Sequence, residues 1–292
     1  MPLLPLPDPY DFDLSTERYR AWGPDLATLW RDGALHRVVG GREVRIAAAP
    51  GGVEVEPLDP RTEPHVRHLL GLPFDLAAFG EFAAEHEVLA PLAARLRGFR
   101  PPLAPDAFEA LVTSVTAQQV SLFAATAIRN RLVERYGDRA EHAYAFPAPE
   151  RLAAASPDEL VALGFSRRKA EYVVGLARTD LDYAALSSLP DEEVTARLVA
   201  VRGLGVWTAE WFLARHLARP RAWPAGDLGL RRAAERFCAG GRPLRTAEVR
   251  ELGGCFAPYE NLSAQYLLLA LRVCSSTTPA ASSSRARQNR DP

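Results

Sequence analysis

A glycine hairpin between two helices is the densest chemical signal in this 292-residue chain. In the run Leu198-Val-Ala-Val-Arg-Gly-Leu-Gly-Val-Trp-Thr-Ala209, one helix ends and another begins at once. Gly203 and Gly205 permit positive φ and leave the backbone bare. The amides at the start of the second helix, near Val206 and Thr208, then point outward, and such amides bind a phosphate well. The pattern predicts a phosphate contact, and a helix C-cap glycine in an ordinary turn is the alternative.

The next candidate for chemistry is the carboxylate of Asp227. Pro220 and Pro224 interrupt the helix that follows the hairpin, so the chain must turn before another helix begins at Asp227. A carboxylate at the start of a helix commonly caps it by accepting hydrogen bonds from its free amides. A functional carboxylate would look the same in sequence, so the position alone leaves both interpretations open.

Helices must position these residues, and most of the chain beyond residue 100 is predicted to be helical. Apolar side chains recur at helical spacing, and Ser156-Pro-Asp-Glu159 is a capping box with proline at the first helical position. The expected helices span 75–97 (as one or two), 106–115, 120–136, 157–163, 166–177, 191–200, 207–217, 228–238, 246–252 and 258–273.

The first hundred residues have a mixed pattern. Valine-rich runs at 35–46 and 53–55, separated by glycine turns, predict short hairpin strands. The proline-rich segment 99–105 is expected to connect an N-terminal α+β domain (1–100) to a helical region (101–274). Residues 275–292 contain few apolar side chains, and we expect this tail to be disordered.

Composition excludes a disordered or fibrous chain, because 48% of the residues are hydrophobic and 24% are charged. The net charge of −1 gives no hint of a polyanionic partner. However, the segment 195–250 carries eleven arginines against four acidic residues, a charge of +7. It is a candidate for phosphate contacts, and a set of solvated helix faces is the alternative.

Several other kinds of chemistry are excluded or restricted by residue type. Lys169 is the only lysine, so a Schiff base would need it or the N-terminus. The three cysteines, at 238, 255 and 274, form no four-cysteine iron–sulfur or zinc site, and they suit a reducing cytoplasm. The first residues have no signal-peptide pattern, so we expect a cytoplasmic protein. His65 and His68 share a helical face without ligand spacing and are expected at the surface.

Residues 110–128 contain no charged side chain, and this segment is nearly as long as a membrane span. The adjacent Gln118 and Gln119 at the centre of this segment would be costly in hydrocarbon. We therefore expect a buried helical segment with a polar step in the middle.

These segments resemble the helix–hairpin–helix (HhH-GPD) DNA glycosylase superfamily, and within it the DNA-3-methyladenine glycosylase II branch. The hairpin, followed by Trp223-Pro-Ala-Gly-Asp-Leu-Gly-Leu-Arg-Arg232, carries the most specific likeness. Phe108–Ser121 resembles the first helical pair of the family, and Leu163–Ala170 resembles the segment before the hairpin. Pro9-Tyr-Asp11 and the mixed N-terminal part resemble the small α+β (TBP-like) domain of that branch. The implied fold is mainly α.

The resemblance implies an enzyme that flips a damaged nucleotide out of duplex DNA and hydrolyses the N-glycosidic bond of alkylated purines, of the 3-methyladenine and 7-methylguanine type. Asp227 would stabilise the oxocarbenium-like sugar or orient the attacking water. Trp207, Trp211 and Tyr259 would form an aromatic pocket that attracts a cationic purine, with core packing as the alternative. Bifunctional members carry a lysine where this chain has Trp207, so no lyase activity is expected.

The resemblance also implies DNA contacts at Gly203, Gly205, Val206 and Thr208 and at the Gln118–Gln119 step. Gln119 stands where the branch often places an apolar wedge. No cofactor is required, although a monovalent cation held by the backbone carbonyls of Val199, Val201 and Leu204 is implied. We expect a monomer that binds damaged double-stranded DNA. The alternatives are a glycosylase for deaminated or oxidised purines and a DNA-binding module without catalytic activity.

Overall fold

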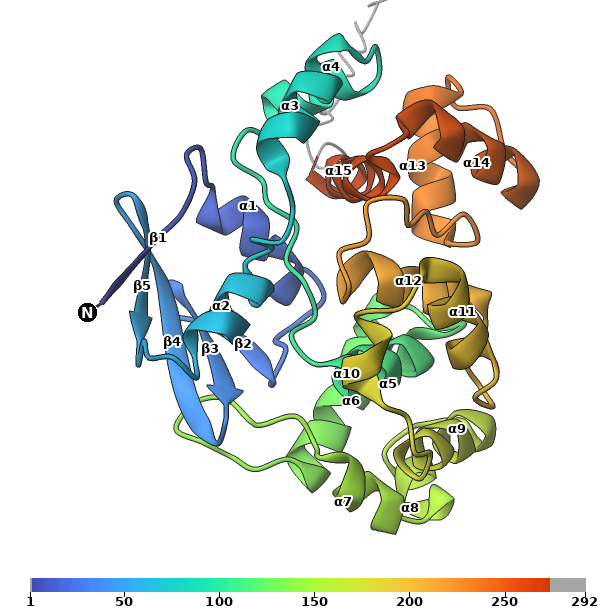
Figure 1. The fold of residues 1–292 in the computed structure, drawn as a ribbon. Coiled ribbons are helices and arrows are strands. Elements are labelled where there is room, and N and C mark those ends of the chain that lie inside the picture. Colours follow the sequence, from blue (N-terminus) through green and yellow to red (C-terminus); the bar gives the residue numbers. More distant parts are fainter. Residues whose placement is uncertain (1, 274–292) are drawn as a thin grey trace, which may run out of the picture.

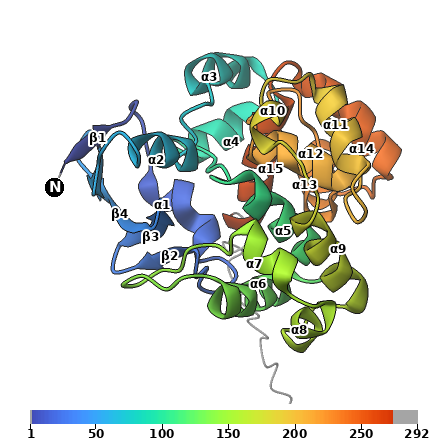
Figure 2. The same cartoon turned by 60° about the horizontal axis from the view of Figure 1, so that its bottom comes forward.

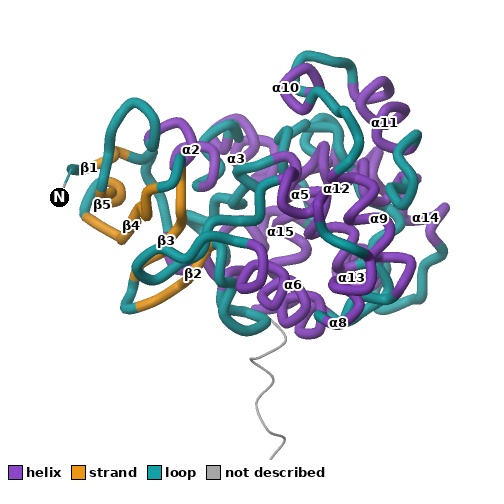
Figure 3. The backbone as a smooth tube through the Cα atoms, turned by 90° about the horizontal axis from the view of Figure 1, so that it is seen from below, coloured by secondary structure: helices purple, strands orange, loops and turns teal. Residues whose placement is uncertain are grey.

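The computed structural model describes residues 2–273, so the tail predicted to be disordered lies outside the described residues. A five-stranded antiparallel sheet lies at one side and a larger group of helices at the other (Figures 1 and 3). This confirms the expected mainly α fold with a small α+β part at the N-terminus.

The sheet has the order β1-β5-β4-β3-β2. Its strands are β1 (Leu3–Pro5), β2 (Thr28–Arg31), β3 (Ala34–Val39), β4 (Arg42–Ala49) and β5 (Gly52–Glu56). Gly40 and Gly41, at φ +55° and +77°, form the turn between β3 and β4, as the glycine pair predicted. Helices α1 (Phe12–Thr16) and α2 (Glu63–Leu69) pack against the sheet through Phe12, Val66 and Leu69.

The remaining helices form one large hydrophobic core. They are α3 (Leu76–Glu85), α4 (Leu89–Arg95), α5 (Ala107–Ala117), α6 (Leu122–Tyr136), α7 (Pro149–Ala154), α8 (Pro157–Ala162), α9 (Arg167–Ala177), α10 (Tyr183–Leu186), α11 (Asp191–Val199), α12 (Val206–Arg215), α13 (Leu228–Cys238), α14 (Thr246–Leu252) and α15 (Glu260–Val273). Short 3-10 turns occur at η1 (Glu17–Tyr19) and η2 (Gly253–Phe256). Helix α15, buried from residue 260 to 270, packs against α4 and α13 (Figure 2).

The residues expected in the N-terminal domain contribute to two hydrophobic cores. Most apolar side chains up to Leu72 pack with the sheet, whereas Leu14, Phe74, Phe79 and Leu89 pack with the helical core. Helices α3 and α4 therefore belong by packing to the helical part, although they precede the proline-rich connection at 99–105.

A hydrogen-bonded cluster joins the sheet to the loop before α7. One oxygen of Glu43 lies 2.9 Å from His36 Nδ1 and 3.0 Å from His142 Nδ1. The other oxygen accepts the backbone N–H groups of His142 and Ala143. Although partial burial acts in the opposite direction, these hydrogen bonds lower the pKa of Glu43 to about 2.

This cluster predicts a specific loss of stability in acid. A carboxyl whose folded pKa is lowered stabilises the fold above its unfolded pKa, and this contribution disappears as the pH falls toward the folded pKa of about 2. We expect Glu43→Gln to lower the free energy of unfolding at pH 6, with the difference from wild type vanishing near pH 2. Urea denaturation across this range measures it, with the exposed Glu87→Gln as control. A difference that stays constant with pH would contradict the assignment.

Candidate active site

A cleft of about 1150 Å³ opens where the α5–α6 step, α12 and the start of α13 meet η1 and the end of α15. Among the residues that line it are Gln118, Gln119, Trp207, Trp211 and Asp227. Two of the segments that were singled out from sequence, the glycine hairpin and the Gln-Gln step, thus meet at one cleft although they lie 85 residues apart.

Asp227 both caps α13 and faces the cleft. Its Oδ1 accepts the Leu230 N–H at 2.9 Å, which satisfies one of the free amides of the helix. Its Oδ2 accepts the indole N–H groups of Trp207 and Trp211, each at 3.2 Å. The two interpretations of Asp227 are therefore not exclusive, because the cap fixes one oxygen while the indoles orient the other.

Hydrogen bonds to α15 and α14 fix the loop that precedes Asp227. Asn261 is fully buried, and its side chain donates to the carbonyls of Ala214 and Arg219 at 2.9 and 3.0 Å. The indole of Trp223 donates to the Val249 carbonyl at 2.8 Å. These contacts turn the chain between α12 and α13 and place Asp227 against the tryptophans.

The hairpin is tightly built around Gly203. Its φ is +96°, and a Cβ at this position would lie 2.2 Å from the ring of Tyr172. The Gln118 side chain donates to the Gly203 carbonyl at 3.0 Å, so this glutamine positions the hairpin. Gly205, in contrast, has an ordinary extended backbone and no neighbour within 4 Å of a built Cβ.

The two hairpin glycines are predicted to respond differently to alanine. Gly203→Ala should lower the free energy of unfolding by about 1–3 kcal/mol, because it adds positive-φ strain and a clash with Tyr172. Gly205→Ala should change it by less than about 1 kcal/mol, the usual cost of a weaker N-cap. Chemical denaturation of both variants tests this, and equal losses would contradict the geometry.

Gln119 occupies a strained position at the α5–α6 step. It has φ +53° and is exposed at the mouth of the cleft. The apolar side chains of Val120, Leu122 and Phe123 beside it are 40%, 46% and 63% exposed. Sequence reasoning predicted a glutamine in place of an apolar wedge and missed these three residues. Exposed apolar side chains on a cleft rim are typical of a contact surface.

The predicted aromatic pocket needs one correction. Trp207 and Trp211 line the cleft, but Tyr259 is not among its lining residues. Instead, the Tyr259 ring packs against Phe79 and Phe82 of α3, with centroid separations of 5.9 and 5.2 Å. The sequence could not reveal that α3 covers this ring, because α3 was assigned to the N-terminal domain.

The other predicted hairpin residues divide by exposure. Val206 is half exposed, whereas the Thr208 side chain is buried and its hydroxyl has no hydrogen-bond partner within the described part of the chain. A contact between Thr208 and DNA outside the cleft would therefore be made by its backbone and not by its side chain.

The basic segment is largely neutralised by ion pairs. Eight of its eleven arginines pair with carboxylates, namely Arg197, Arg202, Arg219, Arg221, Arg231, Arg242, Arg245 and Arg250. Several of their partners, such as Glu171 and Glu260, lie outside the segment. Solvated helix faces therefore account for most of this charge, while Arg215 and Arg232 line the cleft.

The other candidate residues within the described part of the chain do not line the cleft. The Lys169 amine donates to the Thr116 carbonyl at 2.9 Å, and it does not line the cleft. His65 is exposed, as expected, and binds the Arg61 carbonyl, whereas His68, which was also expected at the surface, is partly buried and binds the Ala104 carbonyl. Cys238 and Cys255 are free, and Cys274 lies outside the described residues. No helix between residues 2 and 273 is long and apolar enough to cross a membrane.

Comparisons with known proteins agree with this geometry. Residues 112–253 match the HhH-GPD superfamily of base excision DNA repair proteins. A protein from Bacillus subtilis named DNA-3-methyladenine glycosylase is 33% identical over 57% of this chain and 57% of its own length. DNA-3-methyladenine glycosylase 2 of Escherichia coli is 35% identical over 49% of this chain and 50% of its own length.

The chain thus spans little more than half the length of these curated relatives. The structure of 3-methyladenine DNA-glycosylase from Archaeoglobus fulgidus superposes with a TM-score of 0.86 and 27% identity, covering 94% of this chain and 99% of that one. The sequence match covers the hairpin and Asp227, and the structural match extends to the N-terminal sheet. Residues 112–253 of the chain therefore belong to the HhH-GPD superfamily of base excision DNA repair proteins.

Proposed function

We propose that the chain is a DNA glycosylase that hydrolyses the N-glycosidic bond of alkylated purines in duplex DNA. The observation that carries the proposal is the Asp227 carboxylate, held between two indole N–H groups in a cleft beside the hairpin. The relatives described above, which are named 3-methyladenine glycosylases, support the same reaction.

The reaction requires the damaged nucleotide to leave the helix and enter the cleft. The bond from C1′ to the base nitrogen breaks, and its electron pair leaves with the purine. Asp227 stabilises the positive charge that develops on the sugar and orients the water that adds to C1′. The products are the free base and an abasic site, and the proton of the water passes to the base or to solvent.

The DNA would lie across the hairpin and the α5–α6 step. The exposed amides near Gly205 and Val206 at the start of α12 suit a phosphate. Gln119, in its strained conformation, would enter the space left by the flipped nucleotide, with Val120 and Phe123 against the neighbouring bases.

A monovalent cation at the hairpin is part of the same proposal. The carbonyl of Val201 accepts the Leu204 N–H at 3.1 Å, whereas those of Val199 and Leu204 accept no backbone hydrogen bond from the described residues outside the helices. The free carbonyls of Val199, which ends α11, and of Leu204, in the hairpin before α12, suit such an ion. When bound, it would add positive charge next to a DNA phosphate.

We further propose that the enzyme is monofunctional. Cutting the strand through an imine needs an amine near C1′. The Lys169 amine donates to the Thr116 carbonyl and does not itself line the cleft, and Trp207 stands beside Asp227. A monomer in a reducing cytoplasm suits the free thiols of Cys238 and Cys255.

Base release from methylated duplex DNA tests the proposal. We expect the protein to release 3-methyladenine and 7-methylguanine, and the strand to break only after alkali treatment. Strand breaks without alkali would contradict the monofunctional assignment. No release, together with tight binding to DNA, would favour a binding module without catalytic activity.

A further inference from the structure

Two histidines and one carboxylate converge where the sheet meets the segment between α6 and α7. His36 lies on β3, Glu43 lies on β4, and His142 lies in the segment 137–148, which runs beside the sheet (Figures 1 and 2). Among the residues that the structure describes, this is the one group of three such side chains whose ligand atoms all lie within 4.8 Å of one another. We call these three residues the histidine cluster.

The register of the sheet places two of the three side chains on one face. Glu43 is paired with Val38 across the β3–β4 hairpin, and His36 shares the face of Val38 because it is two residues away. The opposite face, which carries Leu35, packs in the core of the sheet. The backbone N–H groups of residues 142 and 143 donate to one oxygen of Glu43 at 2.8 and 3.0 Å. The other oxygen therefore faces both imidazole rings.

The spacing of the three ligand atoms suits a zinc ion. Glu43 Oε1 lies 2.9 Å from His36 Nδ1 and 3.0 Å from His142 Nδ1. Ligand atoms around tetrahedral zinc lie about 3.4 Å apart, so opening each of these two distances by roughly 0.4 Å admits the ion. The side chains of His36 and Glu43 are 8% and 12% exposed, whereas that of His142 is 26% exposed and leaves a path for the ion and a water. Two imidazoles, one carboxylate and a water form a common zinc ligand set.

The placement of protons on the rings can serve a metal ion. An imidazole binds a metal through an unprotonated nitrogen, so both rings must carry their proton on Nε2. The Nε2 of His142 lies 3.9 Å from a carboxylate oxygen of Glu141, and this negative charge favours a proton there. When the protons are on Nδ1 instead, the rings hydrogen-bond to Glu43 in nearly the same arrangement. The site is thus largely formed before an ion binds, and little conformational entropy is lost on binding.

The charge around the histidine cluster also favours a cation. Neutral imidazoles add no charge, whereas Glu43 and the nearby Glu141 each add one negative charge. Arg45 is paired with His36 in the sheet, but Glu56 of β5 is paired with Arg45 in turn, so these two residues add no net charge to the face. The local charge is therefore negative, and it attracts a divalent cation.

We propose that His36 Nδ1, Glu43 Oε1 and His142 Nδ1 bind a zinc ion that joins the sheet to the segment between α6 and α7. The ion connects positions that lie 99 residues apart in the chain. None of the three residues lines the cleft, so the ion stabilises the fold and takes no part in the chemistry at Asp227. This inference is independent of the proposed glycosylase function.

Zinc titration of the chelator-treated full chain, in competition with a coloured chelator, tests the proposal. We expect one ion per chain and a higher melting temperature at saturating zinc, because the ion binds the folded state. His142→Gln should lower the affinity by at least about 100-fold, because losing a ligand costs more than losing an outer-shell partner. The matched control is His65→Gln, which removes an exposed histidine of α2 and should bind zinc like the wild type.

Glu43→Gln is the second variant, and melting in chelator shows whether each variant is folded. The acid dependence expected above for Glu43→Gln applies to chelator-treated protein, in which the hydrogen bonds alone hold the cluster. Zinc bound equally well by His142→Gln and Glu43→Gln would overturn the proposal, because the ion would then lie elsewhere, for example on cysteines. No zinc bound by the wild type at micromolar concentrations would also overturn it.

A crystal grown with zinc locates the ion directly, because anomalous scattering at the zinc edge should give a peak between the three ligand atoms. A peak elsewhere and none at the histidine cluster would contradict the assignment. The single-turnover rate of base release at a temperature where the chain is folded should be the same with and without zinc. Failure of base release under both conditions would concern the proposed function and not the zinc site.

Discussion

Asp227→Asn is expected to lower the rate of base release by at least about 100-fold, the usual loss when a group that stabilises transition-state charge is neutralised. The carboxylate is held by three N–H donors at 2.9–3.2 Å. An amide keeps the shape but lacks the negative charge that opposes the oxocarbenium-like sugar. The measurement is the single-turnover release of 3-methyladenine and 7-methylguanine from methylated duplex DNA.

The same substitution should spare the N-cap of α13 and DNA binding, although the amide NH2 does not accept the two indole N–H groups. Asparagine caps helices about as well as aspartate, so α13 keeps its N-cap. Affinity for DNA that contains an abasic-site analogue should therefore stay within a few-fold of wild type.

Asp75→Asn is the matched control, because Asp75 caps α3 in the same way, accepting the Ala78 N–H at 3.1 Å away from the cleft. If Asp227→Asn retained base release, Asp227 would be only a cap. If it lost binding and release together, the effect could not be assigned to catalysis.

Local patterns predicted the helices well. The capping box of Ser156 and Glu159 forms as expected, and the predicted spans 228–238 and 246–252 coincide with α13 and α14. These signals lie within a few residues of each other and depend little on the rest of the fold. In contrast, β1 and β2 were missed, because each is only three or four residues long. In addition, β1 pairs with β5, which lies far along the chain, whereas β2 forms a tight hairpin with β3.

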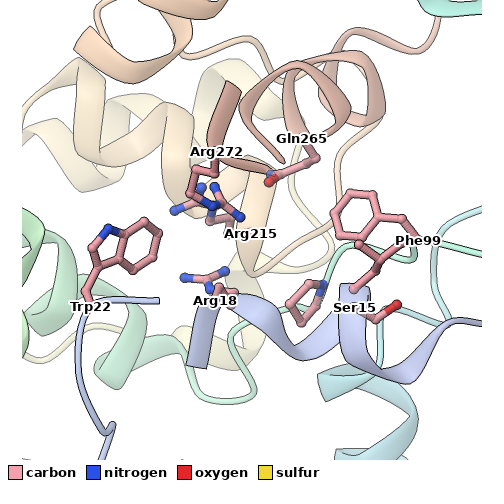
Figure 4. A pocket seen from close by; sticks show the side chains of 9 residues that line it. Ser15, Arg18, Trp22, Phe99, Arg215, Gln265 and Arg272 are labelled. Atoms are coloured by element: carbon pink, nitrogen blue, oxygen red, sulfur yellow. The ribbon is translucent and has the colours of Figure 1, made fainter. Parts of the chain in front are cut away.

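The part of the site that could be predicted from the sequence is the part whose residues come from one short segment. Trp207, Trp211 and Asp227 lie within 21 residues, joined by a short proline-rich loop, and the structure brings them together. The three arginines that gather at one wall of the cleft were missed because they come from residues 18, 215 and 272, and ordinary spacing cannot bring them together (Figure 4). Tyr259 was misplaced for the same reason, since the covering ring comes from α3.

A second large effect, on the free energy of unfolding, is expected for a buried ion-pair cluster where the sheet meets the helices. Glu109 of α5 is 5% exposed, and its carboxylate pairs with Arg129 of α6 at 2.6 Å and with Arg37 of β3 at 2.5 Å. Although burial alone would raise its pKa, the two arginines outweigh it, so the pKa of Glu109 is lowered. The ionised carboxylate therefore holds two buried cations, one from each part of the fold.

Glu109→Ala should lower the free energy of unfolding by about 3–5 kcal/mol, because removing one member of a buried ionic group leaves Arg37 without an ion pair, whereas Arg129 keeps its pair with Asp25. Urea denaturation at pH 7 measures the loss. Glu63→Ala, which breaks the exposed pair with Arg67 within α2, should cost no more than about 1 kcal/mol. Equal losses in the two variants would show that burial does not set the energy of the Glu109 pairs. Since Arg37 lies on β3, a full loss would also show that this carboxylate couples the sheet to the helices that line the cleft.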